Sequence, residues 1–555
     1  MKRNNTKAKL PPAVLRSKKI FPKLDAWMEK HSRHLLIGIL LVASILSLLM
    51  FDAKISTGGD DSLYVHAGYD YMTQGSKYYF NANAPLYPMI LALVMLVTGF
   101  HLILFKTLSI LFFLASIILI YYTFERRIPY SILFSILAFQ AVNYYFLYHA
   151  SQTYTESFFI MMQALFFLAA RYLIDALGDK KKSFYQTWKP WLLFGMMLFL
   201  LAMSKNVAIT ALVAAILYFL IRKEFVYAVY TVGAFSIFRV SFEFLKRLIW
   251  GNIGQYSTQL NILLQKNPYD ASQGNENFGG FIQRLIDNTI IYWDRLLFQI
   301  LGFSDEGDLD KPLLAIIIVV LIAGALIVFW KEKNKLLLFT GTYVIALCGA
   351  TFLVVQPFWG QLRLVLVVVP FMLMLIFMFG YWFFNKPKCH GFQWILILLM
   401  LTVLFGSISE TVPHIEKNYP IIRKNLAGDM YFGFTPDWVN YLRMCEWAAD
   451  SLPSSSFVAC RKPEMAFIYG KGKSFYGIYN VPTQDPDTIL ARFKSVGVTH
   501  VIDANLRTNP NIADGVIIST VRRTIMPIYQ KYPEKLKLVH IIGQSEPAYI
   551  FELKN

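Results

Sequence analysis

The chain has 555 residues, of which 56% are hydrophobic and 16% charged, and it carries a net charge of +18. Soluble domains have about 45–50% apolar and about 25% charged residues, so this composition excludes an ordinary soluble protein. Apolar runs of the length that a helix needs to cross a bilayer, about 20 residues, recur from Leu35 to Phe405. The composition therefore predicts a polytopic α-helical membrane protein.

The first 34 residues are strongly basic. They contain ten Lys and Arg residues against Asp25 and Glu29, a net charge of +8. The positive-inside rule places such a segment in the cytoplasm, so the basic excess is topological and predicts no nucleic-acid partner. A signal peptide over 1–51 is the alternative, but its basic region would be long and no clear small-residue cleavage site follows Phe51. We predict a cytoplasmic N-terminus (1–34) and an uncleaved first span.

Basic residues follow five later apolar runs, at 126–127, 180–182, 222–223, 331–335 and 386–388. All of them can be cytoplasmic if "APLYPMILALVMLVTG" (84–99), short and with two prolines, lies along the outer face instead of crossing. The predicted spans are then 35–51, 103–123, 130–148, 157–177, 190–204, 207–221, 225–245, 312–330, 336–356, 363–384 and 393–409.

The chain is predicted to cross the membrane about eleven times. It is predicted to have two folded parts. A transmembrane domain (35–409), with a first outer loop at 52–102, precedes an extracytoplasmic domain (410–555) of ordinary globular composition. The protein is predicted to reside in the bacterial inner membrane.

Two adjacent carboxylates, Asp60 and Asp61, begin the first outer loop. One interpretation is structural: Asp60 caps a helix that starts at Ser62, and the same helix N-terminus stabilises Asp61. The other is chemical, and the two are compatible because a helix N-terminus also fixes a catalytic carboxylate. Tyr64, one helical turn after Asp60, is predicted to line the same site.

Other ionisable residues stand at outer helix ends. Glu156 lies in a short loop seven residues after His149, Lys205 marks an outer turn, and Arg363 begins a later span. Charged residues at membrane depth are costly, so they usually face a cavity or a partner. Taken singly, Lys205 and Arg363 read as anchors at the membrane surface. Together the group describes a site that combines carboxylates and cations.

In order and topology, these features resemble the GT-C superfamily of integral-membrane glycosyltransferases, in the branch of protein O-mannosyltransferases and lipid A aminoarabinose transferases. Asp60-Asp61-Ser62-Leu63-Tyr64 is similar to the first-loop motif of that branch, and the proline-containing run with Pro85, Tyr87 and Gly99 to its interfacial helix. Glu156, Lys205 and the run "QLRLVLVVVP" with Arg363 match its later features. The chain departs from the branch at Asp61, where many relatives have Glu, at Glu156, usually Asp, and at Asn83 and Ala84, where lipid A transferases carry Lys.

The resemblance implies transfer of a hexosyl or pentosyl group from a polyprenyl-phosphate donor to an acceptor hydroxyl of an envelope glycan, glycolipid or protein. Asp60 would be the base, with Asp61 beside it, and a divalent metal held by Asp60 or Asp61 is the rival role. Glu156 would orient the acceptor or complete a carboxylate pair. The other implied residues are Lys205, Arg363 and, more weakly, Arg247 for the donor phosphate, and Tyr64, Tyr87 and His149 as a lining.

Two segments outside this site also allow predictions. In 246–311, "FIQRLIDNTIIYWDRLLFQILGF" (281–303) has the period of an amphipathic helix, and the preceding Gly- and Asn-rich stretch (267–280) is a candidate lid. The C-terminal domain shows β-prone runs and one helix closed by Gly497, which predicts a small α/β unit. Cys445 and Cys460 lie outside, where they could be bridged or remain free thiols.

Two other functions stay open. A secondary transporter would also be polytopic, but it usually shows internal repeats and interrupted helices, and we find no repeat. A lipid-linked oligosaccharide ligase would use the same kind of carrier. Membrane lipids are partners in every case.

Overall fold

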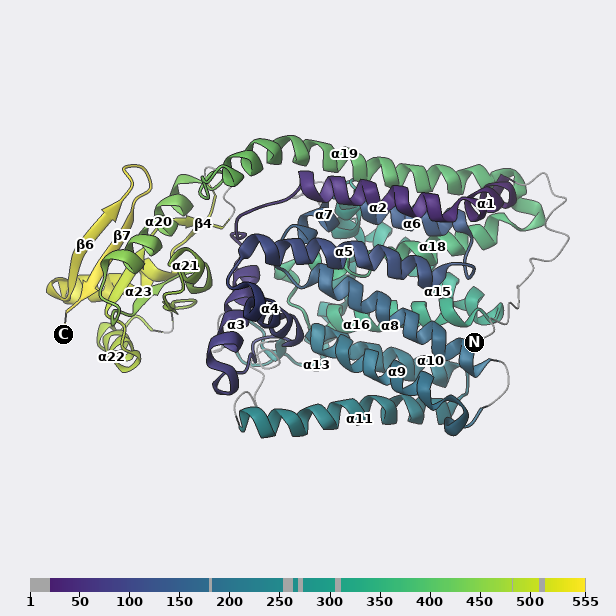
Figure 1. Ribbon diagram of the computed structural model, residues 1–555, viewed down its shortest axis with the longest axis horizontal. Coiled ribbons are helices and arrows are strands. Elements are labelled where there is room, and N and C mark those ends of the chain that lie inside the picture. Colours follow the sequence, from purple (N-terminus) through teal and green to yellow (C-terminus); the bar gives the residue numbers. More distant parts are fainter. Residues whose placement is uncertain are drawn as a thin grey trace.

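The computed structural model describes residues 20–178, 182–252, 263–267, 273–304, 311–481, 483–508 and 515–554. It consists of a helical bundle and a smaller α/β domain beyond one end of the bundle (Figure 1). The bundle helices are α1 (Ile20–Lys30), α2 (Ser32–Leu49), α3 (Asp60–Gln74), α4 (Leu86–Thr98), α5 (Leu102–Phe124), α6 (Tyr130–Val142), α7 (Tyr144–Ala150), α8 (Glu156–Leu177), α9 (Phe184–Ser204), α10 (Thr210–Ile221), α11 (Phe225–Trp250), α13 (Phe278–Ile291), α14 (Leu297–Ile300), α15 (Pro312–Lys331), α16 (Lys335–Val354), α17 (Arg363–Leu366), α18 (Val369–Phe384) and α19 (Gln393–Leu426).

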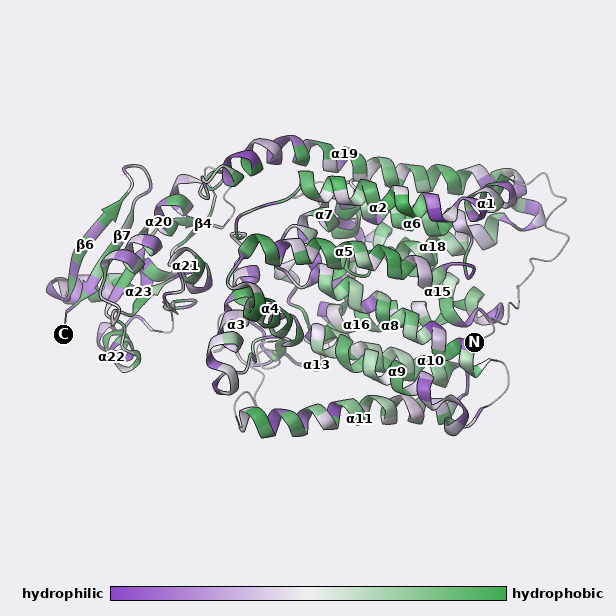
Figure 2. Cartoon of the chain, in the orientation of Figure 1, coloured by the Kyte–Doolittle hydropathy of each residue, from purple (hydrophilic) through white to green (hydrophobic). Residues whose placement is uncertain are grey.

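The bundle has the helices of a multi-pass membrane protein. Within the described residues, eight helices are long and apolar enough to cross a bilayer, and a ninth span results if the bent pair α6 and α7 counts as one. Figure 2 shows the apolar character along these helices. Two further predicted spans, 207–221 and 363–384, correspond to the shorter apolar helices Asn206–Ile221 and α18. The α-helical membrane fold predicted from the composition is confirmed.

Some predicted spans differ in detail from the observed helices. The run 130–148 is broken at Asn143, with a bend of 59° between α6 and α7. Asn143 adopts an extended backbone, accepts a hydrogen bond from the Tyr145 amide at 3.1 Å, and donates one to the carbonyl of Ile300 at 2.6 Å. Its side chain thus caps α7 and interrupts the helix.

Two helix ends also fall elsewhere than predicted. The 363–384 run divides into α17 and α18, and α19 runs through residue 409 to Leu426. One continuous helix therefore crosses the predicted boundary between the two domains, because its polar second half extends it beyond the apolar run (Figure 1).

The first loop forms α3 and α4, which pack against each other. A Cβ on Gly68 would lie 3.0 Å from the Cβ of Leu91 and 3.3 Å from the carbonyl oxygen of Pro88, so glycine lets the two backbones approach closely. At 13 residues α4 is about 20 Å long, shorter than a hydrocarbon core of about 30 Å. This length fits a helix that lies at the membrane surface.

The predicted amphipathic helix over 281–303 begins earlier, at Phe278, and has three parts. A π-helical turn, Tyr292–Leu296, joins α13 to α14. The candidate lid (267–280) includes residues 268–272, which lie outside the described residues.

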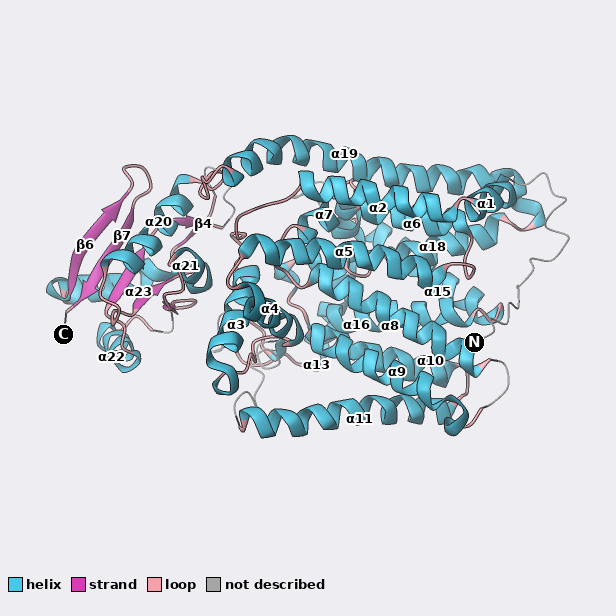
Figure 3. Cartoon of the chain, in the orientation of Figure 1, coloured by secondary structure: helices cyan, strands magenta, loops and turns pink. Residues whose placement is uncertain are grey.

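The C-terminal domain contains both sheets (Figure 3). The larger has the order β2-β1-β3-β7-β6: β1 pairs in parallel with β2 and β3, and β7 pairs antiparallel with β3 and β6. The smaller sheet pairs β4 with β5. The elements of the domain are α20 (Pro436–Ser451), β1 (Val458–Cys460), α21 (Pro463–Tyr469), β2 (Phe475–Gly477), α22 (Pro486–Val496), β3 (His500–Asp503), β4 (Leu506–Arg507), β5 (Ile517–Ile518), α23 (Thr520–Lys531), β6 (Leu536–Ile542) and β7 (Ala548–Leu553).

This domain agrees with the predicted α/β unit. The four predicted β-prone runs form β1, β2, β3 and β6, and Gly497 ends α22 in the left-handed conformation that glycine tolerates. The sequence reading missed β7, which pairs on both sides inside the sheet. Cys445 and Cys460 are buried free thiols, so the unbridged alternative holds.

Candidate active site

The predicted site lies at the end of the bundle that carries the first loop, which we call the first-loop end. Here the N-terminus of α3 meets the start of α8, the end of α9 and the segment before α18. The helix α3 begins at Asp60, and Gly59, with φ of +92°, is its N-cap. The expected cap by Asp60 on a helix starting at Ser62 is therefore wrong, because glycine allows the left-handed turn one residue earlier.

Asp60 and Asp61 both lie in the first turn of α3 but face different surroundings. The side chain of Asp60 is 41% exposed, whereas Asp61 is fully buried. Asp61 accepts hydrogen bonds from the amides of Ser56 at 2.8 Å and Ser62 at 2.9 Å. Burial raises the pKa of Asp61, against the opposing effect of Lys106 and of the bonds from Ser56. Asp61 therefore anchors the loop, and Asp60 is the carboxylate that a substrate can reach.

Arg363 forms an ion pair with Asp60 from a segment 303 residues further along the chain. Its guanidinium also lies 5.4 Å from the centre of the Tyr154 ring and donates to Gln361 at 3.2 Å. The cation is thus held in place by a carboxylate, an amide oxygen and an aromatic ring.

The second acidic group forms its own ion pair. Glu156, at the start of α8, is buried and accepts a hydrogen bond from the ammonium of Lys205 at 2.8 Å. Nδ1 of His149 lies 4.0 Å from the other Glu156 oxygen, and within the described residues neither of these two atoms has a hydrogen-bond partner. Lys205 also lies over the ring of Phe159, at 5.6 Å. Two unsatisfied buried polar atoms side by side are unusual in a packed interior and mark a place for a ligand or water.

Two aromatic side chains, Tyr64 and Tyr87, lie at the same end of the bundle as the two ion pairs. The ring of Tyr64 lies 5.8 Å from that of Tyr87 on α4, and the Tyr87 hydroxyl lies 3.4 Å from Ser109. Burial raises the pKa of the Tyr64 phenol, and the charges of Asp60, Arg363 and Glu156 all act on it. Tyr64 therefore stands among the predicted charges.

Arg247 is the predicted residue that the structure does not bring to this group. It lies exposed near the end of α11. No hydrogen bond or ion pair joins it to the other candidates within the part of the chain that the structure describes. The sequence shows that Arg247 lies near the end of a helix, but it does not show in which direction the side chain points.

A buried network beneath the loop was missed by the sequence reading. Lys106 on α5 is fully buried and donates to Gln152 at 2.7 Å and to the carbonyl of Lys54. Asp52 accepts from Lys54 at 3.0 Å and from Gln152 at 3.0 Å. Burial raises the pKa of Asp52, but Lys106 and Lys54 outweigh it and the pKa is lowered. A lone lysine inside the apolar run 102–124 was the available signal.

The C-terminal domain also reaches the site. Lys462, directly before α21, donates to the carbonyls of Thr57 and Gly58 at 3.0 Å each. One turn further, Phe467 stacks on His66 of α3 with ring centres 4.0 Å apart. Burial lowers the pKa of Lys462, while Asp60 and Glu464 oppose that effect. No sequence motif distinguishes Lys462 from the many other surface lysines, so only the tertiary contact identifies it.

The two aspartates do not fit the alternative role as metal ligands. Both oxygens of Asp61 are occupied by backbone amides, and Asp60 faces a guanidinium. A hard divalent cation needs several convergent oxygen ligands. In the described part of the chain, no group of three or more His, Cys, Asp or Glu side chains could hold a metal ion.

Comparison with solved structures shows which fold this is. The archaeal oligosaccharyltransferase AglB from Archaeoglobus fulgidus, in complex with an inhibitory peptide and a dolichol-phosphate, matches with a TM-score of 0.51 and 9% identity over 85% of this chain and 70% of AglB. The same enzyme with Zn and sulfate gives a TM-score of 0.53 at 10% identity, over 85% and 68%. ArnT from Cupriavidus metallidurans, bound to undecaprenyl phosphate, gives 0.50 at 9% identity, over 93% and 97%.

These neighbours confirm the resemblance to GT-C proteins at the level of the fold. No family model and no curated protein matches the sequence. At 9–10% identity the likeness is one of architecture, and the chemistry has to be argued from the site.

Proposed function

We propose that this protein is a glycosyltransferase that moves a monosaccharide from a polyprenyl-phosphate donor to a hydroxyl of an envelope glycan, glycolipid or protein, at the outer face of the bacterial inner membrane. The observation that carries this proposal is the convergence of two ion pairs, Arg363–Asp60 and Lys205–Glu156, at one end of the bundle. Four separate segments supply them. Such a cluster offers both a base and cations for a phosphate leaving group.

The neighbours support a lipid-linked donor. ArnT was solved with undecaprenyl phosphate and AglB with a dolichol-phosphate. A cluster at the ends of membrane helices suits such a donor, because the lipid tail can stay in the bilayer while the phosphate reaches the charges. The match spans 97% of ArnT and 70% of AglB.

The reaction would proceed by one displacement. Asp60 takes the proton of the acceptor hydroxyl, whose oxygen forms a bond to the anomeric carbon as the bond from that carbon to the phosphate oxygen breaks. The leaving polyprenyl phosphate keeps the electron pair, and Arg363 and Lys205 stabilise its developing charge. A single displacement of this kind inverts the anomeric centre.

The ion pair between Arg363 and Asp60 gives this order of events a physical basis. In the structure Arg363 donates a hydrogen bond to Asp60, the carboxylate that must act as base. A donor phosphate, with more charge and more acceptor oxygens than a carboxylate, would draw the guanidinium away. Asp60 then becomes available as a base only when the donor is bound. It would therefore not deprotonate the acceptor hydroxyl in the absence of a sugar donor.

The remaining predicted residues take supporting roles. Asp61 and the Lys106 network hold the loop that presents Asp60, and Glu156 fixes Lys205 and faces the acceptor together with His149. Tyr64 and Tyr87 form the aromatic lining. None of these steps uses a metal ion.

A lipid-linked oligosaccharide ligase is the second candidate, since AglB matches with TM-scores up to 0.53. The two are separated by the donor. Purified protein in liposomes is given either a radiolabelled polyprenyl-phosphate monosaccharide or a pyrophosphate-linked glycan, with membrane acceptors. Transfer from the first supports the proposal, and transfer from the second alone supports the ligase.

The residue test is Asp60→Asn, which keeps the shape and removes the base. We expect a loss of about 10²–10⁴-fold in transfer, the usual contribution of a general base. Asp70→Asn, in the same helix and paired with His66, is the matched control and should keep the wild-type rate. Full transfer by a folded Asp60→Asn protein would refute the assignment.

A further inference from the structure

A second charged site lies at the opposite end of the bundle, which we call the far end. A pocket of about 450 Å³ lies there between the ends of α5 and α8 and the start of α16. Its charged lining residues are Arg126, Arg127, Arg171, Asp175, Lys333 and Lys335.

The pocket is about one membrane thickness away from the candidate active site. Glu156 begins α8, and Asp175, which lines the pocket, lies 19 residues later in the last turn of the same helix. At a rise of 1.5 Å per residue this is about 30 Å, the thickness of a hydrocarbon core. The pocket therefore lies at the headgroup level of the other leaflet.

Cations outnumber carboxylates in this pocket. Asp175 pairs with Arg127 at 2.5 Å and with Arg171 at 3.8 Å. No carboxylate lies within ion-pair distance of Arg126 or Lys333 in the described part of the chain. The positive charge is therefore only partly compensated from within the protein.

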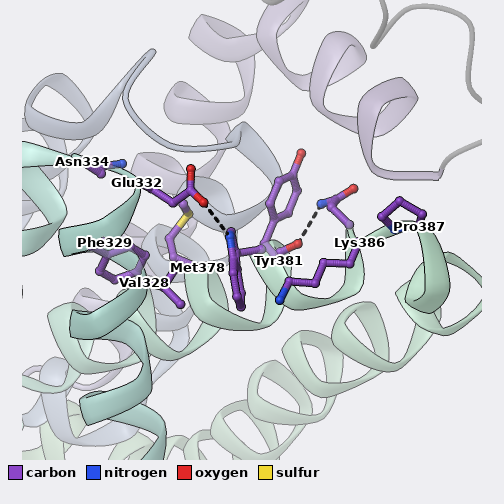
Figure 4. Close-up of a pocket in the computed structure, with 10 residues that line it drawn as sticks. Val328, Phe329, Glu332, Asn334, Met378, Tyr381, Lys386 and Pro387 are labelled. Carbon is purple, nitrogen blue, oxygen red and sulfur yellow. Dashed lines mark hydrogen bonds between the residues drawn. The ribbon is translucent and has the colours of Figure 1, made fainter.

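The neighbouring carboxylates do not change this balance. Glu125 and Glu332 neighbour lining residues in sequence but do not line the pocket, and Asp179, next to Gly178, lies outside the described residues. Glu332 lines an adjoining pocket, where it accepts a hydrogen bond from Trp382 at 3.3 Å (Figure 4). Even counting all three with Asp175, the five lining cations remain in excess.

Part of the pocket is rigidly built. The guanidinium of Arg171 donates to the carbonyl of Thr123 at 3.1 Å and to that of Tyr122, at the end of α5. Lys335 donates to the carbonyl of Gly178, so α16 is tied to the end of α8. Two exposed tyrosines, Tyr122 at 49% and Tyr172 at 50%, adjoin Thr123 and Arg171 in sequence at the same helix ends and do not line the pocket itself. Exposed tyrosines are typical of the headgroup region of a membrane.

We propose that this pocket binds the phosphate of an anionic phospholipid headgroup in the leaflet opposite the candidate active site. The excess cations supply the charge, and the exposed tyrosines at the same helix ends supply the amphipathic side chains typical of the headgroup level. A soluble phosphate would use the same cations but not these tyrosines. The site is separate from donor binding, because it lies at the other end of α5 and α8.

The test uses the variant Arg126→Asn/Lys333→Asn. Both residues have positive φ, +62° and +54°, and asparagine tolerates that conformation, so the charges are removed without added backbone strain. Phosphatidylglycerol and phosphatidylcholine are titrated separately onto delipidated protein and binding is counted by native mass spectrometry. We expect wild-type protein to prefer phosphatidylglycerol and the variant to bind it about thirtyfold more weakly.

The matched control is Lys331→Asn/Lys388→Asn, which removes two exposed basic residues at the same end of the bundle but outside the pocket lining. An equal loss in this control, or equal binding of the two lipids by wild-type protein, would overturn the proposal. Inorganic pyrophosphate added to protein that already carries phosphatidylglycerol separates the sources: if it displaces the lipid at similar concentration, the site takes soluble anions and the proposal fails.

A second measurement covers the case in which the variant does not fold. In wild-type protein, phosphatidylglycerol should slow hydrogen exchange at 122–127 and 171–178 more than phosphatidylcholine does. Equal protection by the two lipids would contradict the proposal.

Discussion

The two ends of helix α8 carry charge in opposite ways. At its start, Glu156 is paired with Lys205, and beside it Asp60 is paired with Arg363. At its end, among the described residues, several cations share one lining carboxylate, that of Asp175. Charges that are balanced in advance suit a site where groups exchange partners during a reaction. Charges that are left in excess suit a site whose partner comes from outside.

The largest difference between the two ends is expected in stability. Lys205→Met leaves the buried carboxylate of Glu156 without its cation, which should lower the free energy of unfolding by about 3–5 kcal/mol. At the far end, Lys333→Asn removes an excess charge and should change it by less than about 0.5 kcal/mol. Thermal unfolding in detergent measures both. Lys205→Met/Glu156→Gln should recover much of the loss, and equal effects of the two single variants would contradict the comparison.

The next effect concerns the donor phosphate. Arg363→Gln should lower transfer by about 10²–10³-fold, the usual loss when one group that stabilises a transition state is removed. Arg247→Gln should lower it much less, because the structure leaves Arg247 apart from the cluster. Initial rates at saturating and limiting donor separate binding from chemistry. A larger loss for Arg247→Gln would show that the cluster is not the donor site.

Removing the contact between the two domains is expected to lower transfer less, by shifting the position of the first loop. Lys462→Met removes the bonds to the carbonyls of Thr57 and Gly58 while keeping the length of the side chain. We expect faster hydrogen exchange at 56–60 and a fall in kcat of up to about 10²-fold, from misplacement of Asp60. Lys471→Met, which affects an exposed lysine of the same domain, is the control. Unchanged exchange at 56–60 would mean that Lys462 does not position the loop.

The smallest effect is expected from metal removal. Incubation with a chelator should leave transfer within about twofold of the untreated rate, because the described residues bring no third His, Cys, Asp or Glu to the two aspartates as a metal ligand. Re-addition of Mg²⁺, Mn²⁺ or Zn²⁺ is the control. A strict metal requirement would show that the two ion pairs rearrange before catalysis.

The candidate site could be predicted in part from position along the chain. Asp60, Glu156, Lys205 and Arg363 were found because ionisable residues at helix ends on one face of a membrane are few and costly. Arg247 met the same criterion but lies apart. Position in a sequence gives the depth of a residue in the membrane but not its direction around the helix axis.

The difference between Asp60 and Asp61 needed the structure. Both are adjacent in sequence, and the resemblance alone favoured Asp60. The helix begins at Asp60, two residues earlier than expected, and places both aspartates in its first turn, with Asp61 turned inward onto two amides and Asp60 outward to Arg363. Adjacent residues on a helix differ by about 100° in direction, so the two neighbouring carboxylates face different surroundings.

The sequence by itself determined the membrane class, most of the helices and the α/β character of the C-terminal domain, because hydrophobic period and length are local properties of the chain. Only the tertiary structure decided which charges meet. Ion pairs between residues 60 and 363 or 156 and 205, the contact of Lys462 with the first loop, and the far pocket all join segments that no local pattern connects. Their partners are set by how helices rotate and pack against one another.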